Sequence, residues 1–461
     1  MGGTVASGAS DLDDTDFSGV SIDTRTLRPG ELFVAIRGER FDGATFVGAA
    51  VKAGATGVVV ARGRNGGAVS EKRPGPPVVV IEVDETTTAL QALAQAIRRR
   101  SGTKVVAITG SAGKTTTKEV TYEFLAARYS VVRNRGNFNN HIGLPLSLIE
   151  LRERPEMAVV ELGMNHAGEI STLVRVAEPD VRVWTNVGEA HLGFFPSVDA
   201  IADAKAEIFE GATPATVLVA NADDDRVARR MSRFSGRVVT FGIDRDADVR
   251  ATAVRSRGVG GIDAHVTTPQ GAFELTTPLV GRANLANVLA AAAVGVECGV
   301  PLGAMAEVAR RLTPASRRGE VLELAKGVTV IDDSYNANPT ATKRALEVLG
   351  DVADQSRRVA VLGEMLELGE RSVALHEDIG RAAAVAKVSV VIAVGGDAAR
   401  ALAEAAVAAG IERASVRYVA TSDEAADAAS ALVRAGDVVL VKGSRGVRTD
   451  RVVDRLKAEF A

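Results

Sequence analysis

The stretch "AITGSAGKTTTKEV", residues 107–120, places a glycine-rich turn between an apolar run and a helical pattern. The run before it, "TKVVAIT", is β-branched and apolar, which predicts a buried strand. Gly110 and Gly113 allow a tight turn whose N–H groups converge on an anion at the start of the next helix. Lys114 then supplies a cation for the β- and γ-phosphates, and the Thr115 hydroxyl can reach Mg²⁺. The stretch therefore predicts an ATP-binding loop.

This loop is a shorter variant of the usual phosphate loop. The usual pattern has a glycine five positions before the second glycine, and here that position is Ile108. The pattern present is T-G-x-x-G-K-T, and strand, loop and helix still follow one another in the required order.

Composition is that of an ordinary globular protein. At 461 residues the chain is too long for one core. A formal net charge of −3 gives no argument for nucleic acid or an anionic membrane, so we predict neither partner. The single cysteine, Cys298, excludes an intrachain disulfide and fits a reducing compartment. The N-terminus lacks a signal-peptide pattern and no apolar stretch is long enough to span a bilayer, so we expect a cytoplasmic protein without membrane insertion.

Alternating strand and helix patterns predict an α/β protein of three domains. Residues 1–98 read as a small N-terminal α/β domain, with short strands and a closing helix. Residues 99–313 alternate around the phosphate loop, as in a mostly parallel sheet. Residues 314–461 begin the alternation again, which predicts a second, Rossmann-like doubly wound sheet without G-x-G-x-x-G.

Polar residues gather where strands end, which is where open α/β sheets bind ligands. Glu161 closes "MAVVEL" and His191 follows "VRVWTNVGEA". Together with Lys114 and Thr115 they favour a divalent-metal site, although each alone is compatible with a hydrogen-bonded loop residue. Lys205, in "ADAKAEIF", lies on a patterned helix and by itself reads as a surface lysine.

Two asparagine-rich loops are further candidates. "GNFNNHIGLP" (136–145) suits substrate hydrogen bonding or a structured turn, and "DDSYNANP" (332–339) could grip a ribose, a base or a polar substrate. The sequence contains no G-x-S-x-G, no H-E-x-x-H, no paired cysteines and no kinase H-R-D or D-F-G set. ATP is therefore expected either to drive motion or to activate a substrate.

Several motifs together resemble the Mur ligase family from about residue 17 to the end. They are T-G-S-A-G-K-T-T-T-K-E, N-F-N-N-H-I-G-L-P, E-L-G-M-N-H-A-G-E-I, A-H-L, K-A-E-I-F, D-S-Y-N-A-N-P and L-G-E-M-L-E-L-G. The pattern is closest to the members that add D-alanyl-D-alanine to UDP-N-acetylmuramoyl-tripeptide. The resemblance implies ATP, Mg²⁺, an acyl-phosphate intermediate, peptidoglycan precursor synthesis and a three-domain clamp. We expect a monomer.

The resemblance also implies roles for individual residues. The ATP phosphates would be held by Gly110, Ser111, Ala112, Gly113, Lys114, Thr115 and Thr116. The catalytic residues would be Lys114, Glu161, His191 and Lys205. The magnesium ions would be served by Thr115, Glu161, His191 and a carbamylated Lys205. Nucleotide contacts would come from Asn287, Arg318, Asp333, Tyr335 and Asn336. The UDP-linked substrate would be held by Ser21, Asp23, Thr24, Arg25, Asn137, Asn139 and Asn140.

The sequence departs from the family at three points. Ala283 and Ala44 stand where the family often has histidine, which puts local substrate or nucleotide contacts in question. The family usually has a helical segment before the stretch that corresponds to "GGTVASG", so the sequence does not predict the fold of residues 1–16.

Three alternatives stay open. A ligase that adds a diamino acid to the dipeptide precursor typically carries D-N-P-R, which does not occur here. A folylpolyglutamate synthetase is disfavoured by "SIDTR" (21–25) in the first domain. A P-loop ATPase switch would release phosphate without a carboxylate and an amine substrate.

Overall fold

The computed structural model describes residues 4–7, 16–38, 41–64, 78–352 and 356–461. The chain divides into two compact units. Unit 1 comprises Met1–Val105, Val132–Gly163 and Glu169–Pro179, and unit 2 comprises Val106–Val131, Met164–Gly168 and Asp180–Ala461. Most of residues 1–16, whose fold the sequence did not predict, lie outside the described residues. The three domain limits given above remain a proposal.

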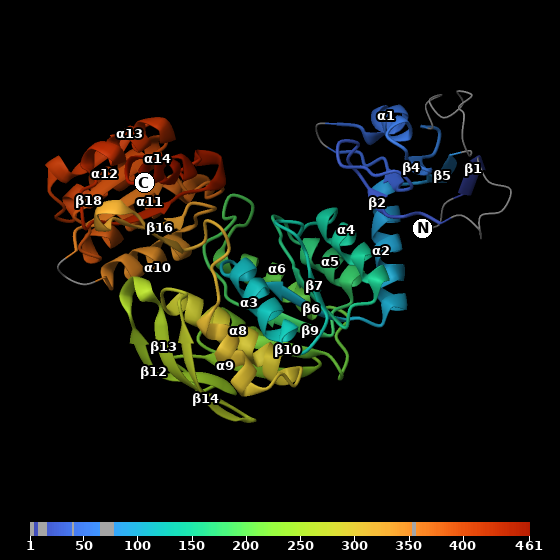
Figure 1. The fold of residues 1–461 in the computed structure, drawn as a ribbon, viewed down its shortest axis with the longest axis horizontal. Helices are drawn as coiled ribbons and strands as arrows, with labels where there is room; N and C mark the ends of the chain where they lie inside the picture. The colour runs from blue at the N-terminus through green and yellow to red at the C-terminus, as the bar shows by residue number, and fades with distance from the viewer. Residues whose placement is uncertain (1–3, 8–15, 39–40, 65–77, 353–355) are drawn as a thin grey trace. The chain divides into compact units, whose positions relative to one another are not determined.

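The N-terminal part of unit 1 is a five-stranded sheet with the strand order β1-β5-β4-β3-β2 (Figure 1). Only β1 is antiparallel to its neighbour. The apolar side chains of β3 and β4 are buried against helix α1, which fits their continuous apolar runs. The elements are β1 (Thr4–Ser7), β2 (Val20–Ser21), β3 (Leu32–Val34), β4 (Gly57–Ala61), β5 (Val79–Val83), η1 (Gly43–Phe46) and α1 (Val47–Lys52).

Helix α2 (Thr86–Ser101) follows this sheet and leads to the next strand. It begins at Glu85, whose carboxylate accepts hydrogen bonds from the N–H groups of Thr87 and Thr88. It ends at Gly102, which has a φ of 72° in the left-handed region that glycine adopts without strain. Sequence-local capping therefore fixes both ends of this helix.

The largest sheet has nine strands in the order β14-β13-β12-β11-β10-β9-β6-β8-β7. In unit 2, strand pairs β6/β9, β9/β10, β10/β11 and β11/β12 are parallel, whereas β12/β13 and β13/β14 are antiparallel. Its strands are β6 (Lys104–Thr109), β7 (Val131–Arg133), β8 (Met157–Glu161), β9 (Val181–Trp184), β10 (Val217–Asn221), β11 (Arg237–Gly242), β12 (Val249–Ser256), β13 (Ile262–Thr268) and β14 (Gly271–Thr277).

The helices that accompany this sheet carry five of the candidate residues, namely Lys114, Thr115 and Thr116 in α3, Lys205 in α6 and Asn287 in α8. Helix α8 is buried along nearly its whole length, because it is apolar all round. The helices are α3 (Lys114–Ala126), α4 (Gly143–Ile149), α5 (Glu169–Ala177), α6 (Val198–Ala206), α7 (Asp225–Met231), α8 (Arg282–Glu297) and α9 (Leu302–Arg310), with short 3-10 turns η2 (Glu150–Glu153), η3 (Glu207–Phe209) and η4 (Gly258–Gly260).

The C-terminal sheet has six strands in the order β15-β16-β20-β17-β18-β19. Only β15 is antiparallel to its neighbour. Its strands are β15 (Glu320–Glu323), β16 (Thr329–Asp333), β17 (Arg358–Gly363), β18 (Val390–Val394), β19 (Val416–Val419) and β20 (Val438–Lys442). Its helices are α10 (Pro339–Gly350), α11 (Ser372–Val385), α12 (Asp397–Ala408), α13 (Ser422–Leu432) and α14 (Asp450–Glu459), with turns η5 (Ala325–Gly327), η6 (Gly369–Arg371), η7 (Arg413–Ser415) and η8 (Arg445–Val447).

The predicted α/β class with a central, mostly parallel sheet is confirmed. Parallel neighbours bring the carboxyl ends of their strands to one edge of a sheet, where the polar loop residues follow. Within the described residues, no helix combines the length and apolar character that crossing a membrane requires.

Candidate active site

The phosphate loop between β6 and α3 depends on its two glycines. Gly110 has a φ of 154°, and a Cβ there would lie 1.9 Å from Thr185 Oγ1. Gly113 has a φ of 80°, and a Cβ there would lie 2.2 Å from Asn287 Oδ1. Side chains are therefore excluded at both positions, by backbone conformation and by space.

The loop is held in shape by two residues that follow β9. Asn186 accepts hydrogen bonds from the N–H groups of Ser111 (3.0 Å) and Ala112 (2.9 Å). The Thr185 hydroxyl and the Asn186 amide both donate to the carbonyl of Ala112. Because the Ser111 and Ala112 N–H groups are engaged within the protein, the anion-binding groups of the loop are expected in the first turn of α3.

Lys114 is the first residue of α3, and its ammonium group turns back over the loop. Lys114 Nζ donates to the carbonyl of Gly110 over 2.8 Å. Gly113 serves as the N-terminal cap of this helix, so the partial positive charge of a 13-residue helix faces the loop. The Lys114 ammonium group and the N-terminus of α3 therefore both contribute positive charge at the loop.

Asn287 of α8 lies against the same loop. Its Oδ1 accepts from the Thr117 hydroxyl (3.3 Å), and its Nδ2 donates to Asn284 (3.2 Å). These contacts place the predicted nucleotide residue directly beside Gly113.

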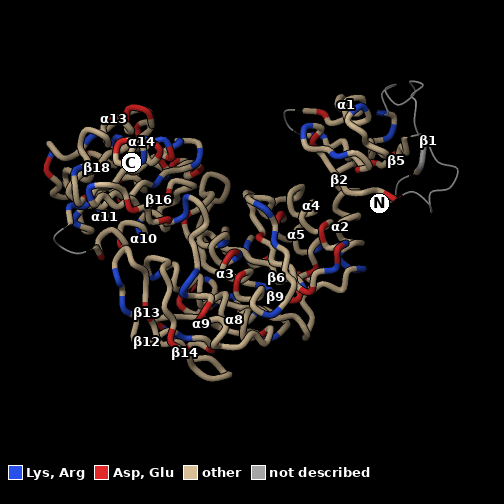
Figure 2. Tube along the Cα trace, in the orientation of Figure 1, with Lys and Arg blue, Asp and Glu red and all other residues tan. Residues whose placement is uncertain are grey.

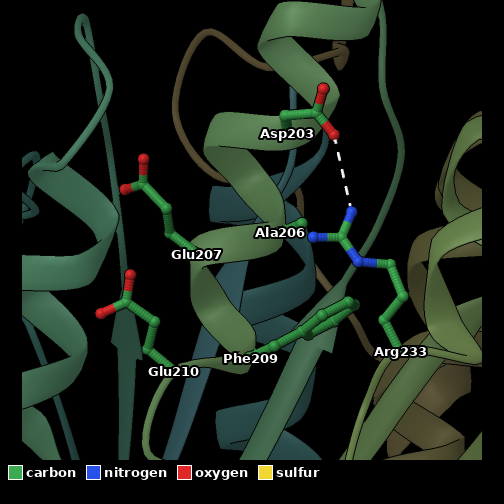
Figure 3. A pocket seen from close by; sticks show the side chains of 6 residues that line it. All are labelled: Asp203, Ala206, Glu207, Phe209, Glu210 and Arg233. Carbon is green, nitrogen blue, oxygen red and sulfur yellow. Dashed lines mark ion pairs between the residues drawn. The ribbon is translucent and has the colours of Figure 1, made fainter.

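Lys205, in the last turn of α6, is 2% exposed. The interpretation of Lys205 as a surface lysine is therefore wrong. The residue lies on the buried face of α6, and the spacing of apolar residues along the helix did not predict this. A hollow of about 350 Å³ lies on the same segment, lined by Asp203, Ala206, Glu207, Phe209, Glu210 and Arg233. In Figure 3 Asp203 and Arg233 face each other while Glu207 and Glu210 point to the other side. None of the predicted site residues lines this hollow.

His191 lies in the loop between β9 and α6. Its Nδ1 lies 2.7 Å from Glu367 Oε2, across 176 residues of sequence. The hydrogen bond from His191 lowers the pKa of the Glu367 carboxyl. The L-G-E-M-L-E-L-G motif carries Glu367, but nothing in its local pattern identifies His191 as the partner.

In unit 1, the asparagine-rich loop is anchored to the end of β8. Asn139 Nδ2 donates to Glu161 Oε1 over 2.8 Å, and Glu161 is 4% exposed. The N–H of Glu161 donates to Asn134 Oδ1. Asn140 Oδ1 instead accepts from the N–H groups of Ile142 and Gly143, at the start of α4. Asn137, the third predicted asparagine, is exposed and its carbonyl accepts from the N–H of Asn139.

The "SIDTR" turn is organised by its own side chains. Arg25 pairs with Asp23 through both Nε and a terminal nitrogen (2.6 Å), and Ser21 Oγ accepts from the N–H of Asp23. The hydrogen bonds from Arg25 lower the pKa of Asp23 to about 2. Thr24, between them, is half-buried. The turn therefore presents an ionised carboxylate and an exposed guanidinium side by side.

A buried lysine organises the C-terminal candidates. Lys442 Nζ, at the end of β20, lies 2.6 Å from Asp333 Oδ2 and donates to the carbonyl of Asn336 (3.0 Å). Lys442 is 3% exposed. Lys442 was not among the residues predicted from the sequence. Its position at the end of the apolar strand "DVVLVK" is the feature of the sequence that could have indicated it.

Tyr335 is contacted by two arginines. The guanidinium carbon of Arg318 lies 4.0 Å from the ring centroid, and that of Arg445 lies 5.4 Å from it. Arg445 also donates to the Tyr335 hydroxyl. Two cations beside one aromatic ring suit a ligand that is both anionic and planar, such as a nucleotide.

Charges are mixed throughout the described chain. Figure 2 shows acidic and basic residues interspersed along both units, in keeping with the small net charge. Among the described residues, no group of three or more His, Cys, Asp or Glu side chains forms a ready metal site. Thr115 in unit 2 and the buried Glu161 in unit 1 each carry a side-chain oxygen of the kind that Mg²⁺ prefers.

A phosphate loop on a mostly parallel sheet, followed by a second α/β sheet with a polar cluster at its strand ends, defines an ATP-binding protein of several α/β domains. Three domain patterns match the chain: "Mur ligase family, catalytic domain" at residues 16–98, "Mur ligase middle domain" at 108–295, and "Mur ligase, glutamate ligase domain" at 317–445. The chain belongs to the Mur ligase family.

Three relatives match it over nearly their whole length. The UDP-N-acetylmuramoyl-tripeptide–D-alanyl-D-alanine ligase of Bacillus subtilis (strain 168) is 35% identical, with 96% of this chain and 93% of the relative covered. MurF from Acinetobacter baumannii has a TM-score of 0.85 at 31% identity, covering 96% of this chain and 94% of that one. MurF ligase from Thermotoga maritima, solved in complex with ADP, has a TM-score of 0.81 at 29% identity, covering 96% and 97%.

Proposed function

We propose that this chain is an ATP-dependent amide ligase that adds D-alanyl-D-alanine to UDP-N-acetylmuramoyl-tripeptide, the last step to the pentapeptide precursor of peptidoglycan. The observation that carries the proposal is 35% identity across 96% of the chain to a ligase of that name. The geometry of the phosphate loop supports the use of ATP, because the loop has the two glycines and the lysine that are typical of ATP binding.

The chemistry follows from the poor reactivity of a carboxylate. Transfer of the γ-phosphoryl group forms a bond from phosphorus to a carboxylate oxygen of the tripeptide and releases ADP. The amine of D-alanyl-D-alanine then attacks the carbonyl carbon, and the tetrahedral intermediate collapses to an amide and inorganic phosphate. The tasks of the protein are to position three substrates and to neutralise charge.

We assign these tasks to residues in both units. Lys114 and the first turn of α3 would neutralise the phosphates. Thr115, Glu161, His191 and Lys205 would serve magnesium, which when bound supplies positive charge to the transferring phosphoryl group. The burial of Lys205 supports a role other than that of a solvated lysine, including the carbamate that the family resemblance implies.

The remaining predicted residues would bind substrate. We propose that the nucleotide is contacted by Arg318, Asp333, Tyr335 and Asn336. The two arginines beside the Tyr335 ring support this assignment. "SIDTR" and the asparagine-rich loop are proposed to hold the UDP-linked substrate. Arg25 supports this proposal, because its exposed guanidinium suits a diphosphate.

The test is phosphate release from ATP and Mg²⁺, measured with the tripeptide substrate alone, with D-alanyl-D-alanine alone, and with both. A further arm supplies UDP-N-acetylmuramoyl-dipeptide and a diamino acid. Release that requires tripeptide and D-alanyl-D-alanine together, with the pentapeptide seen by mass spectrometry and lost in Lys114→Ala, is the expected result.

Two other outcomes would overturn the proposal. Product in the diamino-acid arm alone would make the chain the preceding ligase of the family. Phosphate release that ignores all peptide substrates would instead indicate an ATPase switch.

We also propose that the protein acts in the cytoplasm as a monomer. The location is supported by the proposed use of ATP and a UDP-linked substrate, and cell fractionation tests it. Sedimentation equilibrium tests the oligomeric state, and a dimer at micromolar concentration would contradict the monomer.

A further inference from the structure

The backbone at His191 has an unusual conformation. Its φ is 61°, in the left-handed region that a residue with a side chain rarely adopts. Such a conformation is strained and persists only when its surroundings hold it. The N–H of Phe194 donates to the His191 carbonyl over 2.9 Å, which closes a tight turn.

One residue of the C-terminal sheet contacts this turn at two points. Glu367, in the loop between β17 and η6, also has a left-handed φ, of 65°. Its carboxylate lies 2.7 Å from His191 Nδ1, and its carbonyl accepts from the N–H of Gly193 over 2.7 Å. A Cβ at Gly193 would lie 3.2 Å from that carbonyl oxygen, so a side chain there would require one of the two loops to shift slightly.

The loop that carries Glu367 is held by hydrogen bonds to two other segments of the C-terminal sheet domain. The N–H of Met365 donates to the buried ring of His376 (2.8 Å), and the N–H of Leu366 donates to Ser444 Oγ (2.9 Å). The position of Glu367 is therefore constrained, because its loop is hydrogen-bonded both to α11 and to the segment after β20.

The contact determines which nitrogen of His191 carries the proton. An ionised carboxylate only accepts hydrogen bonds, and Glu367 Oε2 lies within hydrogen-bond distance of Nδ1, at 2.7 Å. Nδ1 must then be the donor, and in the neutral ring Nε2 keeps its lone pair. This is the arrangement by which a carboxylate typically orients a metal-binding histidine.

We infer that Glu367 is a positioning residue of the ligase reaction, which holds the His191 imidazole in its Nδ1–H tautomer so that Nε2 is the nitrogen offered to magnesium. The inference rests on the proposed magnesium role of His191. Because Glu367 comes from the C-terminal sheet, the orientation of His191 depends on the contact between that sheet and the loop after β9.

The first test compares Glu367→Ala, Glu367→Gln and the control Glu370→Ala. Glu370 is an exposed carboxylate three residues further on, in η6. Glu367→Ala is expected to lower kcat about 10–100-fold, as loss of such an orienting partner does. KM for D-alanyl-D-alanine is expected to stay within about twofold, because Glu367 is not proposed to bind it. Glu367→Gln keeps an acceptor oxygen and should recover most of the rate, and Glu370→Ala should match the wild type.

The second test reads the ring directly and does not depend on activity. With only five histidines in the chain, the ¹⁵N ring signals of a histidine-labelled protein can be assigned, that of His191 by its loss in His191→Gln. The wild type should show His191 as the Nδ1–H tautomer, and Glu367→Ala should shift it toward Nε2–H. The affinity for Mn²⁺, a paramagnetic substitute for Mg²⁺, should fall about 10-fold or more in the same variant.

The outcomes separate this inference from the proposed function. An unchanged tautomer in Glu367→Ala, or a kcat equal to that of the wild type in a folded variant, would overturn the role of Glu367. Absence of pentapeptide product in the wild type would overturn the proposed function instead, while the tautomer measurement would still decide whether Glu367 orients the ring.

Discussion

Asn139 Nδ2 donates to Glu161 Oε1 over 2.8 Å, so that the asparagine-rich loop fixes the carboxylate at the end of β8. Without this hydrogen bond the Glu161 side chain gains alternative rotamers at the predicted metal site. We expect Asn139→Ala to lower kcat about 10–100-fold and to raise the Mg²⁺ concentration needed for half-maximal rate. Initial rates of pentapeptide formation across a Mg²⁺ series measure both effects.

The neighbouring Asn140 provides the matched control for this prediction. Its Oδ1 accepts hydrogen bonds from two N–H groups at the start of α4. Asn140→Ala should therefore cost about 0.5–2 kcal/mol of stability and leave the Mg²⁺ dependence unchanged. If both variants shift the Mg²⁺ dependence equally, Asn139 acts only by shaping the loop.

Gly113→Ala is expected to abolish ATP binding. The φ of 80° strains any side chain, and the new Cβ would lie 2.2 Å from Asn287 Oδ1, so either the loop or α8 must shift. Titration calorimetry with ADP should show at least about a 100-fold loss of affinity, since a displacement of the loop removes several phosphate contacts at once.

The control for this variant is Gly303→Ala, in α9. That glycine is helical and a Cβ would meet nothing within 4 Å, so alanine should be neutral or stabilising by up to about 1 kcal/mol. Wild-type affinity for ADP in Gly113→Ala would contradict the steric argument.

The sequence allowed good prediction of features that depend on local order along the chain. The spacing of Gly110 and Gly113 between an apolar strand and a helix indicated a tight turn, and both residues adopt positive φ. The rule that polar residues follow strand ends likewise directed attention to Glu161 and His191, although their metal role stays a prediction.

Features that depend on strand order could not be predicted in this way. Asn186 supports the phosphate loop because β9 lies beside β6, and Lys442 reaches Asp333 because β20 lies beside β16. An alternating pattern of strands and helices does not say which strands become neighbours. The burial of Lys205 was missed for a related reason: lysine is usually exposed, and only tertiary packing decides which face of α6 is covered.

Lys442→Met is predicted to destabilise the C-terminal sheet and weaken nucleotide binding. The substitution leaves Asp333 without its partner at 2.6 Å and leaves the Asn336 carbonyl without a donor. We expect a loss of about 1–3 kcal/mol in the free energy of unfolding. This is less than for a fully buried pair, because Asp333 is partly exposed. Denaturant titration measures the stability, and KM for ATP should rise.

A double substitution and a surface lysine test this interpretation. Asp333→Asn in the Lys442→Met background should recover part of the stability, because no unpaired carboxylate remains. Lys343→Met changes a partly exposed lysine that lies 3.9 Å from the Asp378 carboxylate, and should stay within about 0.5 kcal/mol of the wild type. A loss in Lys442→Met no larger than in Lys343→Met would argue against a structural role of the pair.

His376 is predicted to make stability depend on pH. Its ring is fully buried, with Nε2 accepting from the N–H of Met365 (2.8 Å) and Nδ1 donating to the carbonyl of Ser372 (2.7 Å). Burial lowers its pKa below the ordinary value of 6.5. As pH falls through 6.5 toward the lower folded value, the unfolded ring binds a proton before the folded ring does, so the free energy of unfolding decreases. Above that window the contribution is fully present.

His376→Ala should remove this part of the pH dependence and cost about 2–4 kcal/mol at neutral pH, because two buried backbone groups lose their partners. Urea titrations between pH 5 and about 8 measure both effects, and the difference between the wild-type and variant curves isolates the contribution of His376. If the free energy of unfolding changed equally with pH below 6.5 in the wild type and in His376→Ala, the prediction would be wrong. The buried ring would then not take up a proton on unfolding, and its hydrogen bonds would contribute to stability independently of pH.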